Sequence, residues 1–302
     1  MDKEYAIARY KAAVSLLPPR WHRLALQLPE EQQQIAEELR LRAGQALSVV
    51  LPTGEIYPTE NTEIVMPNDL EQICDAVTGY SRYAVAESIS RGYLTAKGGF
   101  RLGICGRAVI KNGSNTNIRD ISSITIRIAR EITGVCSGIL PQLYEDGQFH
   151  STLIVAPPGA GKTTLLRDLI RVLSNGSEQY PPHRVAIVDE RSEIAVMHQG
   201  LPQMSIGRHT DILDACPKAI GIPMLLRSAN PQIIAVDEIT EAADIRAIVS
   251  ASNCGVRFLA TIHAADKQEL ESKPLYAELL AARVFTNVVI IGNNRQYIVE
   301  KL

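Results

Sequence analysis

Short, unbroken apolar runs mark the second half of this 302-residue chain. Four of them cover residues 152–155, 185–188, 232–236 and 257–262. Runs of this length are typical of strands that are buried on both faces. Polar and helix-like stretches separate them, and strands that alternate with helices favour a parallel sheet with crossover connections. The pattern predicts an α/β fold with a mainly parallel sheet. A helix over 275–282 and a hairpin, with strands over 288–291 and 296–299 joined by an Asn293-Asn294 turn, close the chain.

The first half has a different pattern. Helices are predicted over 3–16, over 68–77 with Asn68 as N-cap, and over 81–90. Strands are predicted over 35–41, over 47–51 and in a β-rich region over 93–129, where Asn112-Gly113 forms a turn. Ile124, Ile126 and Ile128 alternate with polar residues, so they should share one buried face, and Trp21 is predicted to lie in the core. We therefore predict a smaller, mixed α+β N-terminal module over residues 1–138 and a second domain over 139–302, with the boundary near a helix-like stretch at 139–144.

A glycine-rich segment, APPGAGKTT, joins the run at 152–155 to a helical stretch at 165–170. Strand, glycine-rich turn and helix are the context of a phosphate-binding loop, although Ala156 takes the place of the first glycine of G-x-x-x-x-G-K-[ST]. Lys162 would reach the β- and γ-phosphates, and Thr163 would place its hydroxyl on Mg²⁺. The residues expected to bind nucleotide are Pro158, Gly159, Ala160, Gly161, Lys162, Thr163 and Thr164.

Carboxylates follow two of the buried runs. Asp189-Glu190 comes directly after one and Asp237-Glu238 after another. Ligands of open α/β sheets bind at the carboxyl ends of the strands, where such groups can orient water or hold Mg²⁺ and its hydration shell. We expect Asp237 to act on Mg²⁺ through that shell. Glu190 and Glu238 compete for the role of general base, and spacing does not decide between them; Asp189-Glu190 could also simply begin a helix.

A histidine ends the fourth run. His263 follows residues 257–262, where it could sense a γ-phosphate or serve only a structural purpose. Polar residues around 208–218, including Arg208, Asp211 and Asp214, could line the rim of a nucleotide site, which the sequence alone does not decide.

Composition narrows the function classes. The chain is 46% hydrophobic and 21% charged, and its formal net charge is -2, which gives no global argument for nucleic-acid binding. No apolar run reaches the roughly 20 residues of a membrane span, and the charged N-terminus has no apolar signal core. We expect a cytoplasmic protein, peripheral at a membrane only through a partner. The five scattered cysteines are expected to be buried free thiols.

The motifs carry a resemblance to a known family. From Ile124 to Ala264 the chain contains ITIRIAREITG, the phosphate loop, VAIVDERSEIA, TDILDACPKA, LLRSANPQIIAVDEI and ATIHA, in that order. In these motifs it resembles the stage III sporulation protein AA family, of the type II/IV secretion ATPase group. The resemblance implies a RecA-like P-loop ATPase core behind an N-terminal module. It also implies ATP and Mg²⁺ as ligands, and a hexameric ring that energises a secretion-like channel between mother cell and forespore, docked on membrane-bound sporulation proteins.

The resemblance also assigns residues. Gly159 to Thr164 correspond to the Walker A loop. The acidic box corresponds to Asp189, Glu190 and Glu193, Walker B to Asp237-Glu238, and the histidine box to His263. Secretion ATPases have Gly-Glu at Walker B, so Asp237 is a departure that shifts catalytic weight onto Glu238. One arginine would act on a neighbouring subunit's phosphates, and the candidates are Arg101, Arg107, Arg127, Arg130, Arg208 and Arg227.

Three function classes remain at this point. The leading one is an ATP-hydrolysing motor with catalytic Glu190, Glu238 and His263. The second is a nucleotide-gated assembly platform with negligible hydrolysis. The third, a RecA-like nucleic-acid motor, is disfavoured by the net charge and by the lack of basic stretches interleaved with aromatic residues.

Overall fold

The computed structural model describes residues 3–60, 63–79, 86–111, 113–292 and 296–302. The chain divides into two compact units. The first contains Met1–Arg130 together with the short excursion His198–Gln203, and the second contains Glu131–Met197 and Met204–Leu302. The units part a few residues before the predicted boundary at 138/139.

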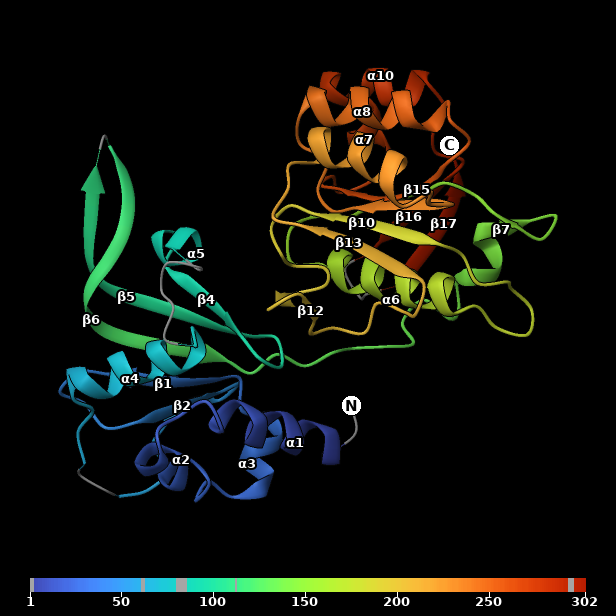
Figure 1. Ribbon diagram of the computed structural model, residues 1–302. Coiled ribbons are helices and arrows are strands. Elements are labelled where there is room, and N and C mark those ends of the chain that lie inside the picture. Colours follow the sequence, from blue (N-terminus) through green and yellow to red (C-terminus); the bar gives the residue numbers. More distant parts are fainter. Residues whose placement is uncertain (1–2, 61–62, 80–85, 112, 293–295) are drawn as a thin grey trace. The chain divides into compact units, whose positions relative to one another are not determined.

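The N-terminal unit is built on an antiparallel sheet, visible in blue to green in Figure 1. Its strand order is β3 (Gly54–Ile56), β2 (Ser48–Leu51), β1 (Glu38–Arg42), β6 (Ser114–Arg127), β5 (Phe100–Lys111), β4 (Tyr93–Ala96). The helices are α1 (Lys3–Val14), α2 (Pro19–Ala25), α3 (Glu30–Ile35), α4 (Pro67–Val77) and α5 (Ala86–Ser90). Ile124, Ile126 and Ile128 are buried, and so is Trp21, as predicted. Mixed α+β is therefore the observed class of this unit.

Some element ends differ from the predictions. The first strand begins at Glu38 rather than at Ile35, because Ile35 closes α3. The fourth helix begins at Pro67, which needs no N–H partner at a first helical position, and Asp69 accepts a hydrogen bond from the N–H of Met66 at 2.8 Å. Asn68 is therefore not the N-cap. The predicted helix over 81–90 is observed from Ala86; residues 81–85, and the turn residues Asn112, Asn293 and Asn294, lie outside the described parts.

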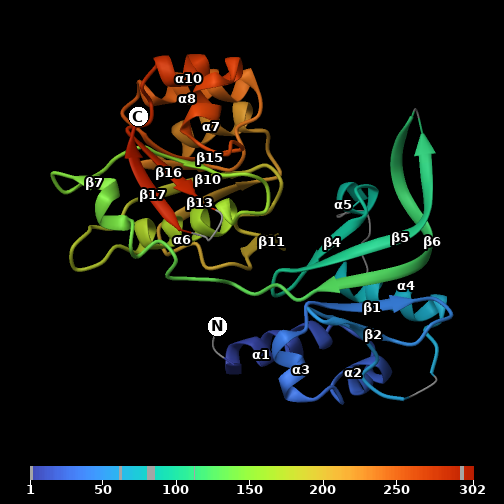
Figure 2. The same cartoon turned by 180° about the vertical axis from the view of Figure 1, so that it is seen from behind.

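The second unit is a seven-stranded sheet covered on both faces (Figures 1 and 2). Its strand order is β13 (Thr210–Asp214), β10 (Val185–Asp189), β14 (Ile233–Val236), β15 (Arg257–Ile262), β9 (Thr152–Val155), β16 (Asn287–Ile291), β17 (Tyr297–Lys301). All neighbours are parallel except β16 and β17, which form the predicted antiparallel hairpin. The predicted mainly parallel α/β sheet is confirmed.

Helices cover this sheet in two layers. On one face lies α6 (Lys162–Asn175); on the other lie α7 (Lys218–Ser228), α8 (Ala242–Ser252) and α10 (Ala277–Ala281). Alternate residues of one strand therefore enter different cores: Leu153 and Val155 pack with the α7–α8 layer, and Ile154 packs with α6. Burial on both faces explains why these strands read as continuous apolar runs. The remaining short elements are 3₁₀ helices at Leu140–Leu143 and Pro274–Tyr276, α9 (Lys267–Ser272), and the hairpins β7 (Tyr144–Glu145)–β8 (Gln148–Phe149) and β11 (Met197–His198)–β12 (Leu201–Pro202).

Strand β13 and helices α7 and α8 are not predicted by the sequence pattern. Helix α7 contains Gly221 and Pro223, two residues that disfavour a helix interior. Gly221 is needed for close packing, because a Cβ built there would lie 2.6 Å from Cγ1 of Val188 on β10. Tertiary packing therefore outweighs local propensity in this helix.

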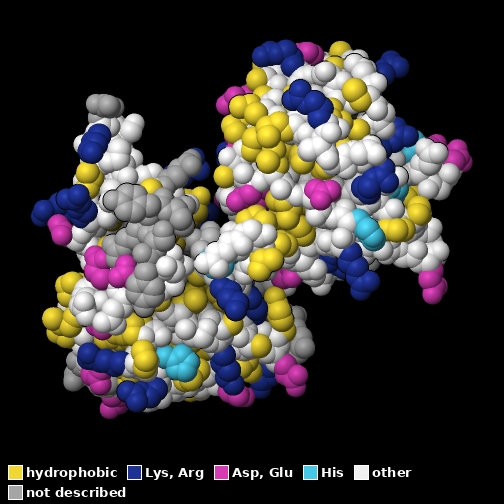
Figure 3. All heavy atoms as spheres, viewed as in Figure 1, with side chains coloured by type: hydrophobic (Ala, Val, Ile, Leu, Met, Phe, Trp, Pro, Cys, Tyr) yellow, Lys and Arg dark blue, Asp and Glu magenta, His cyan; other side chains and the backbone are white. Residues whose placement is uncertain are grey.

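The surface carries no single dominant sign of charge on the face in Figure 3, where basic and acidic side chains are interspersed over both units. None of the described helices is long and apolar enough to cross a bilayer. The five cysteines are free, but only Cys74 and Cys136 are buried; Cys105 and Cys254 are exposed and Cys216 is half-buried. The prediction of buried thiols is thus wrong for Cys105 and Cys254.

Candidate nucleotide site

The glycine-rich segment forms a tight loop between β9 and α6. Gly159 and Gly161 have φ angles of 75° and 102°, a left-handed region that residues with a Cβ rarely adopt. Gly161 is the N-cap of α6, so the loop leads directly into the start of a helix. The first turn of a helix presents free N–H groups and a partial positive charge, which suits phosphate oxygens.

Ala156, which takes the place of the first glycine, faces the core instead of the loop interior. Its side chain is fully buried and packs in the cluster under α6 with Ile154 and Leu165. Its N–H donates to the carbonyl of Ile262 on β15 at 3.4 Å. The methyl group therefore fills core space, which explains why alanine is accommodated at this position.

Lys162 is buried at the start of α6, with 4% of its surface exposed. Its Nζ donates to the carbonyls of Ala156 and Pro157, each at 3.0 Å, and lies 2.8 Å from Nδ1 of His263. Burial lowers the pKa of the Lys162 ammonium, and the negative charges of Glu238 and Asp237 oppose that shift. The ammonium is thus held at the loop by oxygen atoms and by a ring nitrogen.

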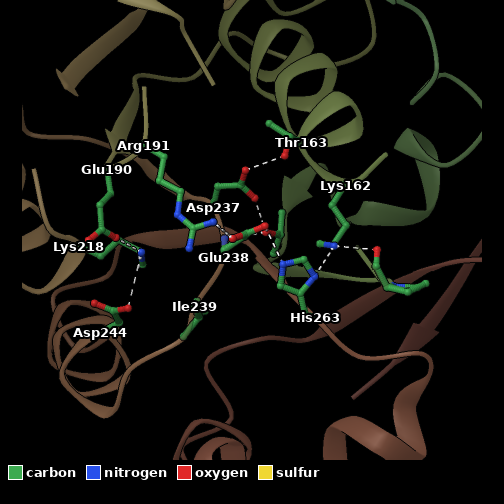
Figure 4. A network of polar contacts seen from close by, with 12 residues as sticks. Lys162, Thr163, Glu190, Arg191, Lys218, Asp237, Glu238, Ile239, Asp244 and His263 are labelled. Atoms are coloured by element: carbon green, nitrogen blue, oxygen red, sulfur yellow. Dashed lines mark hydrogen bonds and ion pairs between the residues drawn. The ribbon is translucent and has the colours of Figure 1, made fainter. Parts of the chain in front are cut away.

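Thr163 connects the loop to the end of β14. Its Oγ1 donates to Oδ2 of Asp237 at 2.7 Å. The other carboxylate oxygen of Asp237 accepts from the hydroxyl of Thr261 on β15, and that hydroxyl accepts the N–H of Glu238 at 2.8 Å. The loop and the carboxyl ends of β14 and β15 are therefore joined by one set of hydrogen bonds (Figure 4).

Glu238 is the centre of a second set of polar contacts. His263 Nε2 lies 2.7 Å from its Oε1, and Arg191 contacts its Oε2. Because an ammonium can only donate, Nδ1 of His263 accepts from Lys162 and the ring proton lies on Nε2. Glu238 also has a φ of 51°, a strained backbone conformation of the kind that concentrates at functional sites. A continuous contact chain thus runs from Lys162 through His263 and Glu238 to Arg191 (Figure 4).

Glu190 belongs to a different cluster. It contacts Nζ of Lys218 at the start of α7, and the same Nζ lies 3.7 Å from Oδ2 of Asp244 on α8. The side chains of Lys218 and Asp244 are 4% and 6% exposed, whereas that of Glu190 is 37% exposed. In Figure 4 this cluster lies apart from Lys162. The two glutamates that the sequence could not separate therefore have different partners.

Asp189 is buried and holds the chain after β10. Its carboxylate accepts the N–H groups of Glu193, Ile194 and Ala195 at 2.8 to 3.0 Å. Burial raises the pKa of Asp189, and these three hydrogen bonds oppose that shift. The guanidinium of Arg167 donates to the carbonyls of residues 193 and 194, each at 2.7 Å. Asp189 therefore fixes the loop that carries Glu190 and Arg191.

Sequence reasoning missed three residues here: Arg191, Lys218 and Thr261. Arg191 stands in VDERSEI and Lys218 in DILDACPK, so both lie in quoted motifs, but an arginine after a strand end is usually solvated. Thr261 lies inside an apolar run and gave no signal. Contacts between strands, which a single sequence does not contain, are what identify them.

The six candidate trans-acting arginines are spread over both units. Arg101, Arg107, Arg127 and Arg130 belong to the N-terminal unit and Arg208 and Arg227 to the second. Arg107 pairs with Asp120 at 3.2 Å and Arg127 with Glu38 at 3.4 Å. Arg130 donates to the carbonyl of Gln34 at 3.0 Å. The choice among the six stays a prediction.

Comparison with known proteins identifies the family. The family model described as "Sporulation stage III, protein AA" matches residues 10–298. Stage III sporulation protein AA of Bacillus subtilis (strain 168) is 37% identical over 270 residues, which are 89% of this chain and 87% of that protein. The uncharacterized protein ycf45 of Cyanidium caldarium is 32% identical over 164 residues, 53% of this chain and 46% of that protein. The chain belongs to the sporulation stage III protein AA family, which confirms the resemblance that its motifs indicate.

Solved structures with a similar fold include an ATPase and a pilus retraction motor. The Legionella pneumophila ATPase DotB matches with a TM-score of 0.53 and 16% identity, over 87% of this chain and 75% of DotB. The pilus retraction motor PilT, solved with bound ADP, matches with a TM-score of 0.57 and 14% identity, over 90% of this chain and 81% of PilT. At these identities the likeness concerns the fold, and it confirms the predicted RecA-like architecture.

Proposed function

We propose that this chain is an ATP-binding and ATP-hydrolysing motor of the secretion ATPase type. One observation carries the proposal: Lys162 and Thr163 of the glycine-rich loop contact His263 and Asp237, which follow two other strands of the same sheet. A phosphate loop beside a carboxylate pair is the arrangement that nucleoside triphosphate hydrolysis requires. Membership of a sporulation family and the fold shared with DotB and PilT point the same way.

The residues fit Mg²⁺ with ATP. The Thr163 hydroxyl and the Asp237 carboxylate supply hard oxygen atoms, which this ion prefers, and they lie 2.7 Å apart. Mg²⁺ would be held at Thr163, with Asp237 acting through its hydration shell, and would supply positive charge to the phosphate oxygens. Lys162 adds a second positive charge at the loop.

In the proposed reaction, Glu238 orients the attacking water and accepts its proton. The water oxygen bonds to the γ-phosphorus while the bond from that phosphorus to the β–γ bridging oxygen breaks, giving ADP and phosphate. His263 holds Glu238 through its Nε2 at 2.7 Å and faces Lys162 through Nδ1. His263 is thereby placed to connect the base with the phosphate loop. Glu190, held by Lys218, is not the base in this proposal.

The biological setting is part of the proposal. We expect the active form to be a hexameric ring in the cytoplasm, docked on membrane-bound sporulation proteins and energising a channel or secretion complex between mother cell and forespore. One of the six arginines named above would complete the site of a neighbouring subunit. A stage III sporulation protein, an ATPase and a pilus retraction motor are among the similar proteins, which is consistent with this setting.

ATP turnover at increasing protein concentration tests the proposal. We expect turnover that rises more than linearly with concentration and disappears in Lys162→Ala, because removing the ammonium removes the cation at the phosphates. Lys301→Ala, a surface lysine of the same unit, is the matched control and should keep full turnover. Full turnover in Lys162→Ala would refute the site.

The choice of base is tested separately. Glu238→Gln keeps the shape of the side chain and removes its proton acceptor, so we expect a loss of about 10²–10⁴ in turnover. Glu190→Gln should retain most of it. The reverse order of effects would assign the base to Glu190 instead.

One observation favours the second candidate, a nucleotide-gated platform with negligible hydrolysis. Both carboxylate oxygens of Glu238 have partners, Oε1 with His263 and Oε2 with Arg191. A glutamate that stays so engaged when ATP is bound would be a poor base. Tight ATP binding that Lys162→Ala abolishes, together with a change of oligomeric state and no turnover, would favour the platform.

A further inference from the structure

A groove of about 900 Å³ lies in the second unit, away from the phosphate loop. It opens at the amino ends of β14 and β15, whereas the nucleotide site lies at the carboxyl ends of the same strands. Its walls come from the end of α7, from the turn that follows α8, from the β7–β8 hairpin and from residues just before β10. Among the lining residues that the structure describes, Arg227 is one of the six candidate trans-acting arginines, and the others have no role in the proposed reaction.

Three arginines line the groove: Arg184, Arg227 and Arg257. None of the described residues that line it is an aspartate or a glutamate. His183 also lines it, but burial lowers the pKa of its imidazole. Like charges gathered without a counter-charge repel one another, so the groove favours an anionic occupant.

The backbone holds two of these arginines at a fixed spacing. The N–H groups of Gln232 and Ile233 donate to the carbonyl of Arg184, and the N–H of Arg257 donates to the carbonyl of Gln232 at 3.0 Å. Gln232 also accepts the N–H of Arg184 on its side-chain oxygen at 3.0 Å. Neighbouring strands are about 4.8 Å apart, so Arg184 and Arg257, which flank the central strand β14, begin about 10 Å apart.

The guanidinium groups keep donors available. Each has five N–H donors, and their described contacts use one apiece: Arg184 to the Asn230 carbonyl, Arg227 to the Pro223 carbonyl and Arg257 to the Gln148 side chain. All three side chains are exposed. Planar guanidinium groups with free N–H pairs match carboxylates in two-point contacts.

The rest of the lining distinguishes among anions. Pro181, Pro223 and Leu226 add accessible apolar surface, which suits the side chains of a peptide. Phe149 is the aromatic residue of the lining and is only 2% exposed, so it offers no open ring on which a nucleobase could stack. The combination favours an acidic peptide segment over a nucleic acid.

We infer that this groove binds an extended, acidic segment of a partner protein, with carboxylates three residues apart. In a polyproline II helix the residues i and i+3 lie on one face, about 9 Å apart, which is close to the backbone separation of Arg184 and Arg257. Apolar residues between the carboxylates contact the proline-rich walls. The inference does not depend on ATP hydrolysis, since Arg184 and Arg257, which carry it, have no part in the proposed nucleotide site.

Fluorescence anisotropy with the full chain tests this inference. The probe is a labelled 12-residue peptide with four Glu-Pro-Leu repeats, and the control probe has Gln in place of every Glu. We expect the glutamate peptide to bind at least about tenfold more tightly than the glutamine peptide, and Arg184→Ala or Arg257→Ala to weaken it about tenfold each. Arg246→Ala, which removes an exposed arginine on α8 outside the groove, should leave binding unchanged.

The chain contains its own footprinting control. Cys254 lines the groove and is exposed, while the exposed Cys105 lies on β5 of the other unit. The glutamate peptide should slow alkylation of Cys254 and leave that of Cys105 unchanged. Arg184→Lys and Arg257→Lys keep the positive charge but lose the planar guanidinium that makes two-point contacts. They should bind the glutamate peptide with intermediate affinity, which would show that the alanine variants lose recognition and are not merely misfolded.

Four results would overturn the inference. The first is equal binding of both peptides, and the second is no binding at all. The third is displacement of the peptide by inorganic phosphate or by a 12-nucleotide oligothymidylate at equal concentration, which would indicate a general anion site. The fourth is protection of Cys254 by higher protein concentration alone, which would place a second copy in the groove. ATP turnover of Arg184→Ala and Arg257→Ala is measured alongside. Normal turnover in these variants shows that a change in peptide binding is independent of the proposed ATPase function.

Discussion

The substitution Lys218→Met tests whether the Glu190 cluster is structural. Lys218 is the cation of this cluster, and its side chain is 4% exposed. Methionine fills similar space without charge, so it leaves the carboxylate of Asp244, 6% exposed, without its cation. Glu190 is 37% exposed and can turn to water. The destabilisation should therefore come mainly from Asp244.

Its magnitude follows from burial. Breaking a buried ion pair by removing one partner costs about 3–5 kcal/mol. Asp244 also lies in the first turn of α8, where the helix dipole stabilises a negative charge by about 0.3–1 kcal/mol. We therefore expect a loss near the lower limit, about 3 kcal/mol. With a urea m-value of about 2 kcal/mol/M, the unfolding midpoint of the second unit should fall by about 1.5 M.

The chain offers a way to separate the two units in this assay. Trp21, the only tryptophan, is fully buried in the N-terminal unit. In urea titrations of Lys218→Met, tryptophan fluorescence should therefore keep its midpoint, while the far-UV circular dichroism transition of the second unit moves to lower urea. Lys301→Met is the matched control: its partner Glu145 is 58% exposed, so both urea midpoints should stay close to those of the wild type.

A double substitution checks the reason for the loss. Asp244→Asn added to Lys218→Met removes the stranded charge, so the double variant should be more stable than Lys218→Met alone. Equal losses in Lys218→Met and Lys301→Met would refute the buried-pair reasoning. A double variant less stable than the single one would show that Asp244 is not the source of the cost.

Arg191→Gln removes a partner of Glu238, and we expect ATP turnover to fall at least about tenfold because Glu238 loses a contact that orients it. The free energy of unfolding should change by less than about 1 kcal/mol, since Arg191 is 57% exposed; unchanged turnover would contradict this role. Burial, reinforced by a hydrogen bond with Asp168, raises the pKa of the Cys136 thiol to about 12. Iodoacetamide should therefore modify Cys136 far more slowly than the exposed Cys105 between about pH 7 and 9. The pKa of Cys136 in the folded state is above its unfolded value of 9.0. The neutral thiol therefore contributes its full stability below pH 9.0, and this contribution is lost as the pH rises towards about 12. As the pH rises over that range, the urea midpoint of Cys136→Ala should accordingly fall less steeply than that of the wild type. An equal fall in the two proteins would contradict this reasoning.

The parallel core was predictable because its strands are buried on both faces. Burial of this kind leaves no polar alternation, and the apolar runs at 152–155 and 257–262 therefore mark strands directly. Helix α7 could not be predicted, because Gly221 and Pro223 disfavour it locally and its stability comes from packing on β10. The tight glycine-rich loop between β9 and α6 was predictable for a different reason: all its residues are adjacent in the chain. Arg191, Lys218 and Thr261 act across strands, and their roles depend on which strands are neighbours.

Strand order also explains why the two Asp-Glu pairs look equivalent in the sequence and differ in space. The glycine-rich loop follows β9, and the sheet runs β10, β14, β15, β9. At about 4.8 Å per strand, the end of β14 is about 10 Å from that of β9, and the end of β10 is about 14 Å away. Glu238, after β14, can therefore be reached from Lys162 through one residue of the intervening strand end, His263. Glu190 is one strand farther from β9, and it contacts Lys218 at the start of α7, which neutralises its charge. The same dipeptide after a buried strand is thus placed for the proposed catalysis when it lies two strands from β9, and for a structural ion pair when it lies three strands from β9.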